Sequence, residues 1–214
     1  MKLLYSYHDS LGPVGRSITA DEAYGSPRPA PRDPRGERPW VGMCMVAGID
    51  GSTVVNGSSQ ALSGDADRSV LVALRRAADT VLVGAGTVRD EGYGPPSKPG
   101  QRIAVVSRSG RVDVSTPLFA SGAGYLVSSD TAGLYAMVAS LGGPFVQLEG
   151  GAGLNASLTD ADVVDEINLT ISPNVTGGNG PRLTRGASDV LQRFDLHHIL
   201  EDDGFVFLRY VRRR

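Results

Sequence analysis

The chain has 214 residues, of which 41% are hydrophobic, and its formal net charge is -2. This length fits one domain with or without an appendage, and a chain of roughly 150 residues already buries about two-thirds of its surface on folding. The composition is that of an ordinary globular protein with no nucleic-acid-binding surface, and no apolar run approaches the ~18 residues that span a membrane.

The scarcity of metal-binding side chains excludes several kinds of site. The chain has one cysteine, Cys44, and three histidines, His8, His197 and His198. These are too few for a Cys/His zinc site or for the zinc-deaminase signature, so we expect no metal. Cys44 lies in an apolar run and is interpreted as a packing residue. The N-terminus "MKLLYSYHDS" lacks a signal-peptide core, which predicts a cytoplasmic protein.

The first segment differs from the rest of the chain. Its stretch "GSPRPAPRDPRGERP" holds five prolines and four arginines without aliphatic periodicity. Such a composition is typical of a linker, so residues 1–38 are expected to form an extended arm and residues 39–214 the folded domain.

From Trp40 onward, apolar strands alternate with helical segments. The patterns predict strands over 40–47, 80–84, 102–106, 125–128, 145–149 and 166–172. They predict helices over 63–79, capped by Ser63, and over 131–142 and 152–161. Residues 194–211 read as a β-hairpin with Asp203-Gly204 in its turn. The expected fold is α/β, with a mainly parallel sheet, flanking helices and a C-terminal antiparallel hairpin.

Two strand-to-helix junctions are rich in glycine: "VLVGAGTVRDEGYGP" at 81–95 and "FVQLEGGAGLNASL" at 145–158. In open α/β sheets, ligands bind beyond the carboxyl ends of the strands, and glycine there lets a phosphate approach a helix N-terminus. The alternative is that these glycines only make tight turns. Residues 151–156 match G-x-G-x-x-A, but the acidic residue expected about 20 positions later is missing. A nucleotide site of another kind than the Rossmann fold is therefore favoured.

Ser107 and Arg108 directly follow the strand at 102–106. A hydroxyl and a guanidinium at that place suit the 2′-phosphate of NADPH, and an exposed polar turn is the equally weighted alternative.

Several motifs, taken in order, resemble one family. They are "MVAGIDG", "SGDADRSVLVALRRAADTVLVGAGTVRDEGYGPP" and "LEGGAGLNASLTDADVVDEINLTISPNVTGGNGPRL". Over about residues 40 to 212 the chain resembles the reductase domain of riboflavin biosynthesis, the RibD C-terminal-domain family, whose fold is similar to dihydrofolate reductase. The resemblance implies an oxidoreductase that transfers a hydride from NADPH to C1′ of a ribosylaminopyrimidine 5′-phosphate, and a homodimer.

The resemblance also implies site residues. Glu149 matches a position on the substrate side, and Ser59 and Arg75 match positions that hold substrate, with Arg75 near the ribose phosphate. The cofactor positions are Thr87, Glu91, Gly150, Gly151, Ala152, Gly153 and Leu154. A surface helix arginine is the alternative for Arg75.

Three positions depart from the family pattern, and the first of them, Cys44, leaves the exact substrate open. Cys44 stands where bifunctional bacterial members often have a lysine, Glu91 replaces a more frequent aspartate, and "GIDG" replaces "SLDG". Asp50 in that motif is interpreted as a turn residue rather than a site carboxylate. A pterin reductase of the dihydrofolate reductase type, with Asp65 or Asp67 at the pterin, is one alternative. A non-catalytic nucleotide-binding protein is the other.

Overall fold

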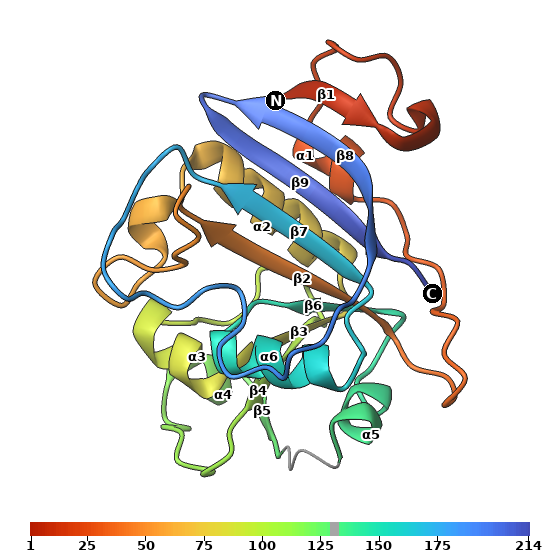
Figure 1. Cartoon of the computed structure of the whole chain (residues 1–214). Helices are drawn as coiled ribbons and strands as arrows, with labels where there is room; N and C mark the ends of the chain where they lie inside the picture. Colours follow the sequence, from red (N-terminus) through yellow and green to blue (C-terminus); the bar gives the residue numbers. More distant parts are fainter. Residues whose placement is uncertain (129–132) are drawn as a thin grey trace.

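The computed structural model describes residues 1–128 and 133–214, and in this part of the chain nine strands form one sheet (Figure 1). The strand order is β1-β8-β9-β7-β2-β6-β3-β4-β5. The bounds are β1 Lys2–Ser6, β2 Trp40–Ala47, β3 Thr80–Gly84, β4 Arg102–Val106, β5 Gly124–Val127, β6 Phe145–Leu148, β7 Glu166–Ile171, β8 Phe194–Asp202 and β9 Phe205–Arg212. The strands from β7 to β5 are parallel, while β9, β8 and β1 continue the sheet with antiparallel pairs.

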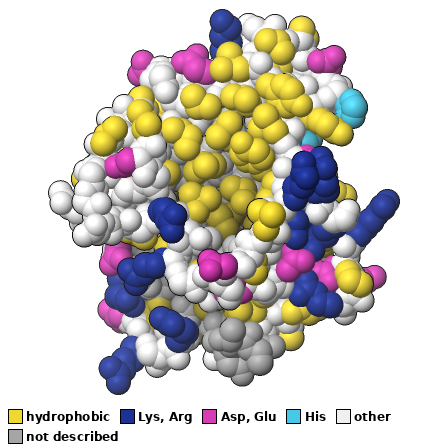
Figure 2. All heavy atoms as spheres, viewed as in Figure 1, with side chains coloured by type: hydrophobic (Ala, Val, Ile, Leu, Met, Phe, Trp, Pro, Cys, Tyr) yellow, Lys and Arg dark blue, Asp and Glu magenta, His cyan; other side chains and the backbone are white. Residues whose placement is uncertain are grey.

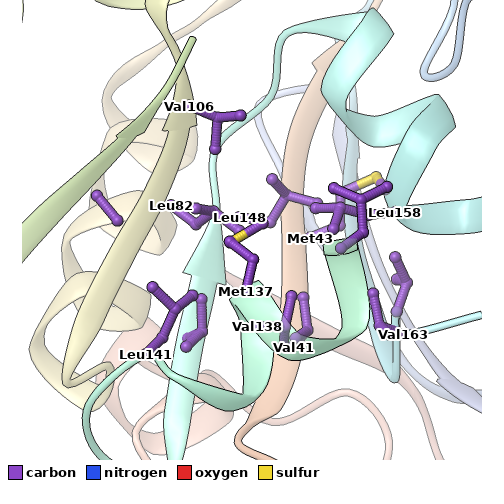
Figure 3. Close-up of a cluster of buried hydrophobic side chains, with 14 residues drawn as sticks. Val41, Met43, Leu82, Val106, Met137, Val138, Leu141, Leu148, Leu158 and Val163 are labelled. Carbon is purple, nitrogen blue, oxygen red and sulfur yellow. The ribbon is translucent and has the colours of Figure 1, made fainter. Parts of the chain in front are cut away.

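Helices cover the parallel part of the sheet on both faces. They are α1 Ala20–Tyr24, α2 Asp65–Ala77, α3 Ala85–Glu91, α4 Pro117–Ala120, α5 Leu134–Ala139 and α6 Ala152–Asp160, with short 3-10 turns η1 Tyr7–Asp9 and η2 Gln60–Leu62. Helix α2 packs on the face that carries Trp40 and Phe145. Helices α5 and α6 pack on the opposite face, where Val41, Met43 and Leu148 interdigitate with Met137 and Leu158 (Figure 3). Within residues 1–128 and 133–214, the structure contains no candidate for a membrane-spanning helix.

The predicted architecture is confirmed. Strands of a parallel sheet are buried on both faces and therefore appear in the sequence as continuous apolar runs. The six strands predicted from such runs are all present, with bounds that agree to within one residue. The predicted hairpin is present, and its turn residues Asp203 and Gly204 both have positive φ (49° and 79°), as a two-residue type I′ turn requires. The predicted helix over 131–142 is observed from Leu134, and residues 131 and 132 lie outside the described part.

The predicted cap of α2 is wrong. The N-cap is Gly64 and makes no side-chain cap hydrogen bond. The Ser63 hydroxyl lies one residue too early and donates instead to Asp67 Oδ2 at 2.6 Å.

The expectation of an extended N-terminal arm is also wrong. Strand β1 pairs with β8, and α1 starts with a capping box between Thr19 and Glu22. Two arginines of the Pro-rich stretch, Arg28 and Arg38, are buried against carboxylates 138 and 127 residues further along the chain. The composition of this stretch is that of a linker, and the carboxylates that bind its arginines cannot be recognised from the local sequence because they lie more than 100 residues away. The domain boundary between residues 38 and 39 stays a prediction.

One face of the antiparallel part of the sheet carries no helix. On β7, Glu166, Asn168 and Thr170 are buried toward the α2 side, whereas the residues between them are only half-buried. The opposite face therefore carries rows of cross-strand apolar neighbours, which are Ile167, Leu169 and Ile171 on β7, Val206, Leu208 and Tyr210 on β9, and Leu196 and Ile199 on β8. Figure 2 shows the resulting hydrophobic patch, in the same view as Figure 1.

Candidate functional site

A cleft of about 1550 Å³ lies at the carboxyl ends of β2, β6, β3 and β4. All twelve residues that the sequence suggested for substrate or cofactor line it, namely Ser59, Arg75, Thr87, Glu91, Ser107, Arg108, Glu149, Gly150, Gly151, Ala152, Gly153 and Leu154. The two glycine-rich junctions follow β3 and β6. These strands are neighbours in the sheet, so the junctions meet at its carboxyl edge. The fold thus gathers segments that are up to 95 positions apart, from Ser59 to Leu154, around one space.

The two glycine junctions are joined by hydrogen bonds. Gly84 N donates to Gly150 O at 2.9 Å, and Gly151 N donates to Thr87 Oγ1 at 2.9 Å. Gly150 has φ +83°, and a Cβ there would lie 3.1 Å from Met45 Sδ. The left-handed backbone conformation therefore favours glycine at this position, and a larger side chain would also press against Met45. The hydroxyl oxygen of Thr87 thus holds the second loop by accepting from Gly151 N.

Glu149, which directly precedes the second glycine junction, forms the centre of a tight polar cluster at the cleft. Its two oxygens accept from Arg75 Nε at 2.7 Å and Nη2 at 2.6 Å. Tyr93 Oη donates to it at 2.6 Å and Gln147 Nε2 at 3.1 Å. Glu149 as a whole residue is 7% exposed, so it borders the cleft, and the donors to its carboxylate are protein groups.

Burial and charge fix the protonation states in this cluster. Burial lowers the pKa of the Arg75 guanidinium, but the hydrogen bonds and charge of Glu149 outweigh this and raise it above its ordinary value. Burial, with the nearby Glu149 charge, raises the pKa of Tyr93 well above 10. The cluster is consequently an ion pair with a neutral phenol, and the Arg75 guanidinium also lies over the Tyr93 ring at 5.3 Å.

Ser59 and Glu91 bond to each other. Glu91 Oε1 accepts from Ser59 N at 2.8 Å and from its hydroxyl at 3.0 Å, while Oε2 accepts from Ser58 Oγ at 3.1 Å. The Glu91 side chain, which is longer than the aspartate more frequent at this position, thus joins the loop before η2 to the end of α3. Both residues shape the wall of the cleft.

Four arginines at the cleft have no side-chain partner in the described part of the chain. They are Arg108, which the sequence suggested, and Arg68, Arg89 and Arg185, which it did not. Most other arginines, such as Arg28, Arg38 and Arg75, are paired with carboxylates. No motif marked Arg185, because it comes from the irregular segment after β7, where Arg185 N donates to Ala152 O at 3.0 Å. The surplus of free guanidinium groups suits anionic ligands.

Cys44 lies at the cleft, whereas Asp50 lies outside it. Cys44 lines the cleft, and burial raises the pKa of its thiol well above the ordinary value. Asp50 is not among the cleft residues. Its Oδ2 accepts from Thr176 N and Gly177 N at 3.0 and 2.8 Å, and Gly51 has φ +81°. These contacts support the interpretation of Asp50 as a turn residue that also holds the loop after β7.

The fold is shared with several solved structures. A pyrimidine reductase-like protein from Corynebacterium diphtheriae is 20% identical with a TM-score of 0.71, and the match covers 92% of this chain and all (100%) of that one. A deaminase/5-amino-6-(5-phosphoribosylamino)uracil reductase from Thermotoga maritima is 17% identical with a TM-score of 0.68, covering 82% of this chain and 57% of that one. A dihydrofolate reductase from Enterococcus faecalis is 13% identical with a TM-score of 0.55, covering 82% of this chain and 97% of that one.

These likenesses show a dihydrofolate-reductase-like fold. The chain spans little more than half of the length of the Thermotoga protein. A comparison with curated proteins found no match. The family described as the RibD C-terminal domain matches residues 39–207, which include every residue of the cleft. The chain therefore belongs to the RibD C-terminal domain family.

Proposed function

We propose that this protein is an NADPH-dependent reductase that reduces the ribose of a ribosylaminopyrimidine 5′-phosphate at C1′, in riboflavin biosynthesis. The observation that carries the proposal is the gathering of two chemically distinct walls in one cleft. One wall is the glycine loop pair at β3 and β6, and the other is the Glu149 cluster. Family membership supports the reaction class, because reductases of this pathway share the fold.

The cleft fits a nicotinamide cofactor together with a second ligand. Pockets for a single small ligand measure roughly 300–1,000 Å³, and this cleft is larger at about 1550 Å³. A Cβ at Gly153 would meet no atom within 4 Å, so the first turn of α6 leaves its N–H groups open to a phosphate. Ser107 and Arg108 at the end of β4 would hold the 2′-phosphate. When bound, NADPH would supply the hydride.

The residues of this chain would bind and orient both ligands. Thr87 keeps the backbone of Gly151 in place, and Glu149 keeps Arg75 and Tyr93 packed as one wall beside the reacting carbon. Among the described residues that line the cleft, Cys44 carries the only thiol, and burial raises the pKa of this thiol well above its ordinary value, which disfavours the nucleophilic thiolate. Such a hydride transfer needs the protein to position the cofactor and the substrate next to each other and to exclude water.

The choice of cofactor is testable at Arg108. We expect Arg108→Ala to weaken NADPH binding by about 10- to 100-fold and to leave NADH binding unchanged, since a hydrogen bond to a charged phosphate is lost. Fluorescence titration of both cofactors measures this. Arg111→Ala, an exposed arginine that does not line the cleft, is the matched control. Equal affinity of the wild-type protein for NADH and NADPH contradicts the proposal.

The substrate is tested by comparing candidates directly. The aminopyrimidine ribosyl phosphate should be reduced with NADPH, and dihydrofolate should not. Turnover of dihydrofolate alone would favour the pterin reductase, with Asp67 at the cleft, and turnover of neither would favour a nucleotide-binding protein.

We propose that a second copy of the chain covers the open sheet face of β7, β9 and β8. Leu208 lies at the middle of this face, paired with Leu169 on one side and Ile199 on the other. Contiguous apolar surface of this kind is typical of interfaces. Leu208→Glu should convert a dimer to a monomer in light scattering, whereas Leu191→Glu, at a fully exposed leucine elsewhere, should not. A wild-type monomer would refute this arrangement.

A further inference from the structure

The loop between α3 and β4, residues 92–101, contacts two parts of the molecule at once. Tyr93, near its start, lines the cleft and donates its hydroxyl to Glu149 Oε2 at 2.6 Å. Gln101, its last residue, is only 4% exposed, and its side-chain amide lies against the end of α2. Residues 92–101 are called the brace loop below, because they connect the cleft with the end of this helix.

The brace loop supplies the polar cap of α2. The last carbonyl groups of a helix have no partner within the helix itself. Gln101 Nε2 donates to Arg75 O at 2.6 Å and to Ala78 O at 2.8 Å. Lys98 Nζ donates to Arg76 O at 2.8 Å and to Ala78 O at 2.7 Å, and its positive charge suits the negative end of the helix dipole. The loop therefore holds the last turn of α2 in place.

Arg75 connects the two ends of the brace loop. Its carbonyl oxygen accepts from Gln101, and its guanidinium donates to both oxygens of Glu149 at 2.7 and 2.6 Å. Glu149 in turn accepts from Tyr93. These contacts form a closed ring, which runs from the loop to α2, across to the end of β6 and back to the loop. Residues in one such hydrogen-bond network do not act independently, so a change at one member affects the others.

The brace loop is also fastened at both of its ends. Gly92 takes the left-handed conformation (φ +66°) that ends α3, and Tyr93 N donates to Val88 O at 3.2 Å. At the other end, Gln101 N donates to Lys98 O at 3.2 Å and closes a turn before β4. Three of the ten residues are prolines, each of which fixes a backbone dihedral. Movement at one end of the loop is therefore restrained by the other.

We infer that Gln101 is a positioning residue of the cleft, which acts through the brace loop and α2 to hold the Arg75–Glu149 pair beside the substrate. The inference rests on the proposed function for its effect on the reaction. It gives a role to a buried side chain that does not line the cleft and that belongs to none of the family-like motifs.

The first experiment measures initial rates with NADPH and the aminopyrimidine ribosyl phosphate, expressed per NADPH-binding site so that unfolded protein does not count. Gln101→Met keeps the bulk of the side chain and removes its donors. It should lower kcat about 10-fold and leave KM and NADPH affinity within a few-fold, because the reacting groups are misplaced. Gln192→Met is the matched control, since Gln192 Nε2 donates in the same way to Thr159 O at 2.8 Å, near the end of α6 and outside the cleft. Its kcat should equal that of the wild type.

A double-mutant cycle tests whether Gln101 acts through the ring of contacts. Tyr93→Phe removes only the hydroxyl that bonds to Glu149 and should also lower kcat about 10-fold. The double variant should again lose about 10-fold, because either change already loosens the same pair. The inference is overturned by an unchanged kcat in Gln101→Met, by an equal loss in Gln192→Met, or by losses that multiply to about 100-fold in the double variant.

Amide hydrogen exchange of the protein without ligands tests the brace loop apart from the proposed reaction. Gln101→Met and Tyr93→Phe should both speed exchange in the last turn of α2, whereas Gln192→Met should speed it only near the end of α6. Faster exchange at α2 in Gln101→Met but not in Tyr93→Phe would overturn the inference, since the two ends of the loop would then be independent. A protein that shows the shared effect but reduces no aminopyrimidine would refute only the proposed reaction.

Discussion

Glu166→Gln should lower the free energy of unfolding by about 3–5 kcal/mol, the cost of breaking a buried ion pair by removing one charge. Glu166 is fully buried, with Arg28 Nε and Nη2 at 2.8 and 2.9 Å and Arg209 Nη2 at 2.8 Å. Trp40 Nε1 and Asn168 Nδ2 complete its hydrogen bonds. The neutral amide would leave two buried guanidinium groups without a counter-charge.

Urea unfolding of the two proteins measures the difference. Glu37→Gln is the matched control, since Glu37 is an exposed glutamate, and it should unfold like the wild type. A loss below about 1 kcal/mol for Glu166→Gln, the size of an exposed pair, would contradict the prediction. Arg28→Ala should show a comparable loss, because it removes the partner that the N-terminal segment inserts beneath the sheet.

The pH dependence has a defined sign. Burial raises the pKa of Glu166, but Arg209 and Arg28 outweigh burial and lower it from 4.5 to about 2. Ionised Glu166 therefore contributes its full stability above pH 4.5, and this contribution is lost as pH falls from 4.5 through 2. The stability difference between wild type and Glu166→Gln should shrink over that acidic range.

Glu149→Gln should reduce kcat/KM of the proposed reaction by about 100-fold, the cost of misplacing reacting groups by an ångström. The amide cannot accept from both nitrogens of Arg75 and from Tyr93 at once, so the wall on the substrate side would loosen. The glycine loop after residue 149 keeps its backbone bonds, so NADPH affinity should stay close to wild type.

Initial rates and cofactor titrations on the same preparations separate these two effects. Glu37→Gln again serves as the control for a glutamate replaced away from the cleft. Full activity in Glu149→Gln would show that the Arg75–Glu149 pair is not needed to position the substrate. A parallel loss of NADPH affinity would show instead that the two walls of the cleft are not independent.

Much of the fold could be predicted because its signals are local. The apolar runs of β2, β3 and β4 and the Asp203-Gly204 turn depend on neighbouring residues alone. The glycine-rich junctions likewise predicted the position of the cleft, since ligands of open α/β sheets bind beyond the carboxyl ends of the strands. The N-terminal segment could not be predicted in this way, because Arg28 and Arg38 acquire partners only when the sheet has formed.

The sequence by itself determined the fold class, the family and twelve of the residues at the cleft, because strand periodicity and ordered motifs are properties of contiguous residues. The tertiary structure alone decided which of those side chains are free. Arg75 and Glu149 are 74 positions apart, and only the packing of α2 beside β6 joins them. Ser59 and Glu91 are joined in the same way, 32 positions apart. Hydrogen bonds between distant segments thus join several of the expected ligand-binding residues to one another, whereas the side chains of Arg68 and Arg108 have no partner among the described residues.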